Sequence, residues 1–200
     1  MISEKFVILA AALNLIGSLG YVRDTLRGKT KPNRVTWSLW ALAPLIAFAA
    51  MIDEGVGLQS LMTFMVGFGP LLVFLASFVS RKSVWQLGKF DYTCGGLSLL
   101  GLSLWLITGD GVIAIGFAIT ADGLAALPTV VKSYKAPETE SSLVFLLSAI
   151  SAGITMLTIS DWNFATYGFP LYIFIICVLI FTLIRFKLGK RMTQIRAGNA

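Results

Sequence analysis

One acidic residue lies in the middle of an apolar stretch, where it could do chemistry. Asp122 is at the centre of the apolar segment 112–131. A carboxylate there costs about 2.5–3.5 kcal/mol on membrane-insertion scales, so it is expected to face other helices or a wet cavity. The chain has no histidine, which leaves Asp122 as the mid-segment group for proton coupling. We expect Asp122 to bind substrate and to carry a proton; the alternative is a structural hydrogen bond to a neighbouring helix.

Segment 6–26 carries a polar stripe at helical spacing. Asn14, Ser18 and Tyr21 are three or four residues apart, so they share one face of a helix. Asn14 is the deepest, and its amide can both donate and accept hydrogen bonds, which suits hydroxyls or nucleobase edges. We expect Asn14 and Ser18 to bind substrate. The alternative is that these small and polar residues only pack helices together.

Two tryptophans begin the next apolar segment. Trp37 and Trp40 are one helical turn apart, and Trp40 is the deeper, where an indole could stack on a flat or ring-shaped ligand. Both are candidate substrate contacts. For Trp37 the alternative is a membrane-interface anchor.

Segment 141–159 carries a stripe of hydroxyl residues. Ser148 and Ser151 are its central members, and hydroxyls that face a pathway would offer adaptable hydrogen bonds to a substrate. The alternative is that each hydroxyl bonds to the backbone of its own helix. We include Ser148 and Ser151 in the predicted binding set.

Motifs for catalysis and for metal binding are missing from the sequence. It has no phosphate-binding loop, no Ser-His-Asp set and no pair of intramembrane carboxylates. Cys94 and Cys177 lie in apolar runs without metal-ligand spacing, which is typical of free buried thiols. We therefore expect no enzyme activity, no catalytic residue, no metal and no cofactor.

The composition is that of a polytopic α-helical membrane protein. Hydrophobic residues make up 56% of the chain and charged residues 13%, against about 25% charged in soluble proteins. The mean hydropathy is +0.83. The apolar segments approach the roughly 20 residues that span a bilayer. Seven transmembrane helices are predicted, over residues 6–26, 35–52, 58–80, 92–108, 112–131, 141–159 and 165–186.

The positive charges predict the orientation. Every lysine and arginine except Lys5 falls in alternate loops or in the C-terminal tail. Cytoplasmic loops are enriched in these residues, so the N-terminus is predicted outside and the C-terminus in the cytoplasm. The cations then need no nucleic-acid partner, and the tail is expected to contact anionic lipid of the bilayer. Short loops and a short chain favour the prokaryotic inner membrane.

An internal repeat relates the two halves of the chain. The stretch 23–41 has a weaker copy at 128–146, in which Pro32 aligns with Pro137 and Arg27 with Lys132. Such repeats are common in transporters. The predicted organisation is a first three-helix bundle (1–88), a linker helix (89–110), a second three-helix bundle (111–190) parallel to the first, and a basic cytoplasmic tail (191–200).

This layout resembles the SWEET and PQ-loop superfamily, which includes sugar carriers, amino-acid exporters, vitamin-precursor carriers of the PnuC type and the KDEL receptor. Trp37-Ser38-Leu39-Trp40 is similar to the paired tryptophans of PnuC-type carriers, whereas the Pro-Gln dipeptide is absent. The resemblance implies that Pro44 and Pro128 are bending points in their helices. We expect the turns at Pro32 and Pro137 to act as hinges.

These observations together predict a secondary transporter or facilitator. It would move a small-molecule substrate (a sugar, a nucleoside or vitamin precursor, or an amino acid) by alternating access, with protons coupled through Asp122. The alternatives are a non-transporting membrane receptor or scaffold of the KDEL-receptor type, or a structural subunit of a membrane complex. The oligomeric state stays open, and a homo-oligomer is compatible with the sequence.

Overall fold

The described part of the chain is all-helical. The computed structural model describes residues 2–79, 85–108 and 111–192. Within these ranges it contains α-helices, one short 3-10 helix and no strand. The elements are α1 (Phe6–Leu26), α2 (Arg34–Asp53), α3 (Ser60–Val79), α4 (Lys89–Thr108), α5 (Gly111–Lys135), η1 (Pro137–Thr139), α6 (Ser142–Thr158) and α7 (Phe164–Phe186). The predicted all-α class is confirmed.

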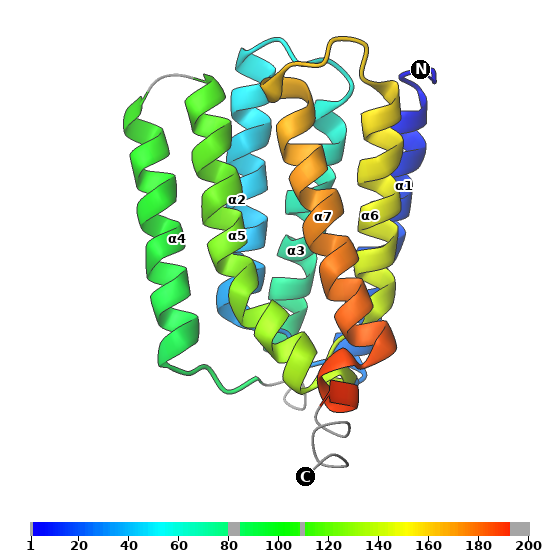
Figure 1. Ribbon diagram of the computed structural model, residues 1–200, viewed down its shortest axis with the longest axis vertical. Helices are drawn as coiled ribbons and strands as arrows, with labels where there is room; N and C mark the ends of the chain where they lie inside the picture. Colours follow the sequence, from blue (N-terminus) through cyan, green and yellow to red (C-terminus); the bar gives the residue numbers. More distant parts are fainter. Residues whose placement is uncertain (1, 80–84, 109–110, 193–200) are drawn as a thin grey trace.

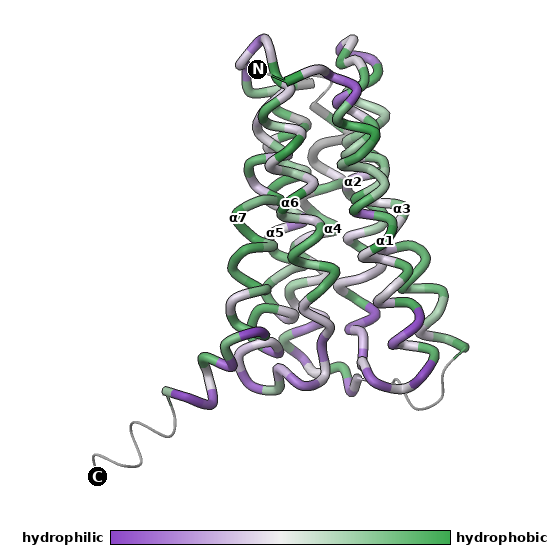
Figure 2. The backbone as a smooth tube through the Cα atoms, turned by 90° about the vertical axis from the view of Figure 1, so that its right-hand side faces the viewer, coloured by the Kyte–Doolittle hydropathy of each residue, from purple (hydrophilic) through white to green (hydrophobic). Residues whose placement is uncertain are grey.

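Length and composition make this a membrane protein. Within the described residues, five helices (α1, α2, α3, α5 and α7) are long and apolar enough to cross a membrane, with mean hydropathies of 1.3 to 2.4. Helix α6 is also apolar but shorter. Figure 2 shows hydrophobic residues along the shafts of the helices and hydrophilic residues gathered at the ends of the molecule. The prediction of transmembrane helices is therefore confirmed.

Local sequence signals set several helix ends. The Asn33 side chain accepts hydrogen bonds from the backbone N–H groups of Val35 and Thr36 at the start of α2. Asn163 forms a capping box with Thr166 at the start of α7. Side-chain oxygens of this kind satisfy the N–H groups that a helix start leaves without partners. The turn residues are thus specified independently of the apolar pattern.

The helices pack in the same order in both halves of the chain. Helix α3 packs against both α1 and α2, and α7 packs against both α5 and α6. Between the halves, α1 packs on α6 and α2 on α5, while α4 lies against α5 and α2. In Figure 1, α1 and α5 both begin at the end that carries the N-terminus. The two triplets α1–α3 and α5–α7 are therefore equivalent in packing order and in direction.

Two glycines let α3 approach the helices on both sides of it. A Cβ atom added to Gly69 would overlap with the Ser18 side chain of α1. A Cβ atom added to Gly67 would lie 2.7 Å from Leu45 and 3.1 Å from the Ala41 carbonyl oxygen of α2. Both distances are shorter than van der Waals contact. The position of α3 between its partners thus depends on residues without side chains.

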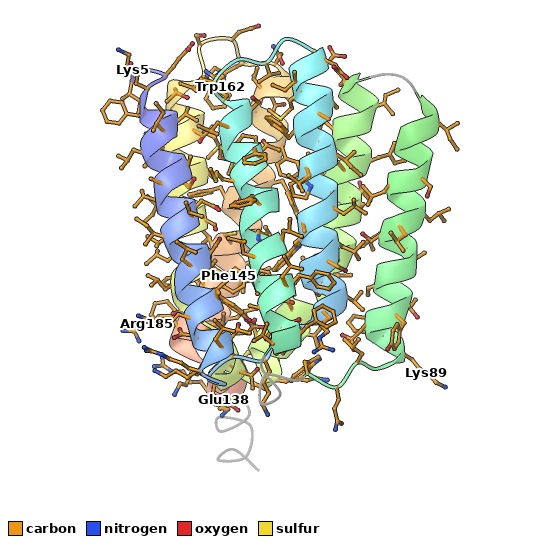
Figure 3. The ribbon with its side chains drawn as sticks, turned by 180° about the vertical axis from the view of Figure 1, so that it is seen from behind. Lys5, Lys89, Glu138, Phe145, Trp162 and Arg185 are labelled. Carbon is orange, nitrogen blue, oxygen red and sulfur yellow. The ribbon has the colours of Figure 1, made fainter. Side chains whose placement is uncertain are left out.

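The two ends of the molecule differ in charge. Figure 3 places Lys5 and Trp162 at one end, and Lys89, Glu138 and Arg185 at the other. We call the second end, which also carries the turn 27–33, the basic end. Three of the cations used to predict orientation, Arg81, Lys82 and Arg196, lie outside the described residues, as do residues 193–200 of the predicted tail.

Candidate functional site

A cavity lies between the two helix triplets. Its volume is about 50 Å³, about three to five times the roughly 10–15 Å³ that a single water needs. Residues from α1, α2 and α3 line it on one side, and residues from α5, α6 and α7 on the other. The predicted binding residues found in its lining are Asp122, Asn14, Trp40, Ser18, Trp37 and Ser148. Side chains from four separate sequence segments are thus brought to one place.

Asp122 has one oxygen bound by the protein and one that is not. Its side chain is buried, at 2% exposure. The Tyr172 hydroxyl donates to Oδ2 at 2.6 Å, whereas Oδ1 has no hydrogen-bond partner among the described residues. Tyr172 therefore holds the carboxyl group in one orientation and leaves a second acceptor for another donor. Sequence reasoning missed Tyr172, because nothing distinguishes it from the other aromatic residues of an apolar helix.

Asn14 also uses only part of its hydrogen-bonding capacity. Its Nδ2 donates to the Ser148 hydroxyl at 3.0 Å, which joins α1 to α6. Its Oδ1 is buried and has no partner within the described ranges. The amide is thus both a helix–helix contact and a free acceptor, so the two interpretations offered for it are compatible.

Aromatic rings form one wall of the cavity. The centroids of Trp37 and Trp40 lie 5.3 Å apart with planes at 81°, and Trp40 meets Phe145 edge-on at 6.1 Å. Phe145 lies inside the bundle, nearer the basic end than the opposite end (Figure 3). Trp37 is only 1% exposed, so its ring does not face lipid as an interface anchor would. The Trp40 Nε1 has no partner in the described part of the chain.

Ser151 is not in the lining of the cavity. Its hydroxyl donates to the Ala10 carbonyl at 2.8 Å and so ties α6 to α1. Thr155 and Thr158 donate to carbonyls of their own helix. The hydroxyl stripe of α6 therefore divides: Ser148 lines the cavity, and the hydroxyls that follow it in α6 donate to backbone carbonyls.

The four prolines predicted to be hinges or bending points lie in different secondary-structure contexts. Pro44 and Pro128 are inside α2 and α5, Pro137 begins η1, and Pro32 lies in the turn before α2. Two more, Pro70 in α3 and Pro170 in α7, were not predicted as bending points.

Pro70 also changes what the backbone offers to the cavity. A proline inside a helix removes the hydrogen bond to the carbonyl four residues earlier, which here belongs to Val66. Val66 and Pro70 both line the cavity. The wall formed by α3 therefore has a backbone carbonyl without its usual helical donor.

A second buried polar cluster lies at the basic end. Lys132 Nζ is 2.6 Å from Glu140 Oε1, and both side chains are at most 1% exposed. The Tyr21 hydroxyl donates to Glu140 Oε2 at 2.6 Å, and Lys132 also donates to the Lys31 carbonyl. We call these groups the basic-end network. It joins α1 and the turn of the first half to α5 and the turn of the second.

The basic-end network lies next to the cavity. The Tyr21 ring is 4.6 Å from the ring of Trp37, which lines the cavity. On the other side, the Lys132 ammonium group is 4.6 Å from the ring of Trp85. The network therefore lies between Trp37 of the cavity wall and Trp85 of the segment before α4.

The electrostatics of the cavity come from a single side chain. Among the described residues that line it, Asp122 is the only one with an ionisable acidic or basic side chain of the Asp, Glu, Lys or Arg type. Cys177, a free buried thiol, also lines it. No group of three or more histidine, cysteine or acidic residues in the described ranges could hold a metal ion. Comparison with protein-family models, with curated proteins and with solved structures finds no match.

Proposed function

We propose that this protein is a secondary carrier or facilitator of a small metabolite. The observation that carries the proposal is the cavity itself, which is lined by both helix triplets and holds a buried carboxyl group with one free oxygen. Substrate sites of transporters with internal repeats lie near the middle of the bilayer, at the interface of the repeats. The lining of the cavity by residues of both triplets supports the same role here.

The proposed architecture has seven membrane helices with the N-terminus outside. Helices α4 and α6 cross the membrane with the other five, and α4 is the linker between two parallel three-helix repeats. Support comes from the shared packing order of the two triplets and from the cations at the basic end. This arrangement is the one expected for a divergent member of the SWEET and PQ-loop superfamily, in the inner membrane of a prokaryote.

Alternating access requires the cavity to open toward each side in turn. The contacts of the basic-end network join the two halves, and on this proposal the route toward the basic end opens only when those contacts separate. The turns with Pro32 and Pro137 flank the network, and Pro44 and Pro128 interrupt the helices above it. These prolines are the proposed hinges.

Asp122 is the proposed proton carrier. The titratable groups near it are Tyr172, which bonds to it, and the Cys177 thiol, which also lines the cavity. No lysine or arginine is found in the cavity lining over the ranges that the structure describes. An ionised Asp122 therefore has no cation to balance it, so loss of its proton favours arrival of water or substrate.

Counterflow in liposomes tests the proposal. Purified protein would be reconstituted with an unlabelled metabolite inside and a trace of the labelled compound outside, over a panel of sugars, nucleosides, vitamin precursors, amino acids and amines. A carrier accumulates label transiently. A receptor binds ligand without accumulating any, and that result would contradict the proposal.

The role of Asp122 is tested in the same liposomes. Asp122→Asn should abolish the pH dependence of uptake, whereas Ser151→Ala, which alters a hydroxyl outside the cavity, should keep it. An Asp122→Asn variant with unchanged uptake and pH response would show that the proton is carried elsewhere.

A further inference from the structure

The charge of the cavity restricts what can bind there. Asp122 is buried, and no other aspartate, glutamate, lysine or arginine is found in the lining within the described part of the chain. A buried carboxylate must be either protonated or paired with a cation. Lys132 is the nearest buried cation along the same helix, and it is already bound by Glu140 and the Lys31 carbonyl. The partner of an ionised Asp122 must therefore enter from outside the protein.

Two polar side chains of the cavity, one from each triplet, have an oxygen that could accept a hydrogen bond from a ligand. Asn14 Oδ1 and Asp122 Oδ1 are acceptors without a protein donor among the described residues. They come from opposite triplets, on α1 and α5. A buried acceptor without a partner costs about 1–3 kcal/mol. One ligand with two N–H groups could satisfy both and connect the two halves.

The walls of the cavity suit a flat cation. The rings of Trp37, Trp40 and Phe145 meet at steep angles, so a ligand between them lies against at least one aromatic face. Cations are attracted to such faces, most strongly to tryptophan and when water is excluded. A planar, delocalised cation can also stack on the ring.

The same lining disfavours anions and zwitterions. A carboxylate or phosphate on the ligand would meet no lysine or arginine among the described lining residues, and only the neutral indole N–H groups of Trp37 and Trp40 would be free to donate to it. Asp122 would repel it. Ordinary amino acids are one of the substrate classes expected from the sequence. They fit this lining less well than amines that have no acid group.

We propose that the cavity binds a compact organic cation, an amidinium or ammonium group with at least two N–H donors, which replaces the proton on Asp122. This inference rests on the proposed function and identifies the substrate class of that site. Asp122 Oδ1 and Asn14 Oδ1 accept the N–H groups. Trp40 contributes its ring face, and Tyr172 keeps the Asp122 carboxyl group in position.

Three molecules of nearly the same shape test the sign of the charge. Acetamidinium, acetamide and acetate are small, planar and alike in outline, and they carry positive, zero and negative charge. Each would be titrated into the detergent-purified protein by calorimetry, in two buffers of different ionisation enthalpy. We expect acetamidinium alone to bind and to release a proton from the protein. Tighter binding of acetamide or acetate, or no binding of acetamidinium, would overturn the proposal.

Variants locate the binding. Asp122→Asn should weaken acetamidinium at least tenfold, and Trp40→Leu should weaken it by a smaller factor. Ser151→Ala is the matched control and should leave the affinity unchanged. If Asp122→Asn does not fold, the proton-release measurement on the unaltered protein still decides the matter, because binding without proton release contradicts the exchange.

Counterflow of labelled acetamidinium separates this inference from the proposed function. Binding without counterflow would keep the cation site and contradict the carrier. Counterflow of a neutral metabolite, by a protein that does not bind acetamidinium, would keep the carrier and contradict the cation site.

Discussion

The buried carboxyl groups of Glu140 and Asp122 differ in their surroundings. Glu140 has both oxygens bound, one by Lys132 and the other by Tyr21. Asp122 has one oxygen bound by Tyr172 and the other without a partner among the described residues. The packing of Tyr21 on Trp37 connects the two regions.

The difference indicates a division of roles. A buried charge that is fully paired contributes to holding the fold in one arrangement, and removal of its partner is strongly destabilising. A buried acid with a free oxygen does little for the fold but can exchange protons or ligands. The basic-end network is thus the structural member of the pair, and the cavity is the site open to exchange.

The largest expected effect on stability comes from the basic-end network. Glu140→Gln leaves the Lys132 ammonium group buried without a counter-ion, and should reduce the free energy of unfolding by about 3–5 kcal/mol. Denaturant unfolding of the purified protein measures it. The double variant Lys132→Met with Glu140→Leu should recover most of the loss, because neither charge is then left alone. A loss below about 1 kcal/mol, as for an exposed pair, would contradict the structural role.

A smaller effect is expected where shape, rather than charge, determines the cavity wall. Gly69→Ala places a methyl group against Ser18 and should cost about 1–3 kcal/mol, which is typical of overpacking. Ser18→Gly in the same chain should restore stability. Gly96→Ala in α4 is the matched control, because a Cβ atom there meets nothing within 4 Å. Equal effects at the two glycines, measured by thermal unfolding, would contradict the close contact of α1 and α3.

At Asp122 itself we expect little change in stability. Asp122→Asn keeps the shape of the side chain, and its oxygen can still accept the Tyr172 hydroxyl. The free energy of unfolding should stay within about 1 kcal/mol of the unaltered protein, the net worth of a typical hydrogen bond, while binding is lost. Unfolding curves check the stability, and calorimetry on the same preparation checks the binding. A loss as large as that of Glu140→Gln would remove the contrast between the two carboxyl groups.

The smallest effect is expected at the exposed surface of the basic end. Lys190 lies 2.8 Å from Glu138, and both side chains are about half exposed. Its hydrogen bond lowers the pKa of the Glu138 carboxyl below the ordinary glutamate value. The pair therefore stabilises the fold at pH values above the ordinary glutamate pKa. This contribution disappears as the pH falls through the lowered pKa of Glu138. Because solvent screens it, we expect only about 0.2–1 kcal/mol.

The contribution of the Glu138–Lys190 pair can be distinguished from the other causes of the loss of stability at low pH. Glu138→Gln should flatten the acid side of the stability profile slightly, and high salt should do the same to the unaltered protein. A salt-insensitive effect would show that the pair is not solvent-exposed in solution.

Much of the site could be found from the sequence, because polar residues in apolar segments are costly and few. Asp122 and Asn14 are recognisable on that ground alone, and the structure brings both to one cavity. Their roles in binding stay predictions. Ser151 looked the same as Ser148 in the sequence, since only the position of α1 decides that one hydroxyl meets a carbonyl and the other meets the cavity.

The basic-end network could not be found from the sequence. The predicted segment ended at residue 131, so Lys132 was assigned to a loop, whereas α5 continues to Lys135. A buried lysine depends on groups distant along the chain, here Glu140 and the Lys31 carbonyl. Helix positions follow from apolar length, but the packing order does not, because helices that are apolar on nearly all sides do not show which face meets which neighbour.

The position of α3 between α1 and α2 has a consequence for how the protein is made. Helices leave the ribosome in sequence order, so α1 and α2 are complete before the helix that separates them is synthesised. In the folded protein the first two helices of each triplet lie about one helix diameter, roughly 10 Å, apart, and the turn 27–33 spans that gap. The lack of side chains at Gly67 and Gly69 lets α3, which is made after both, fit between α1 and α2. The last helix of the first triplet to be synthesised is thus the one that completes that triplet's side of the cavity.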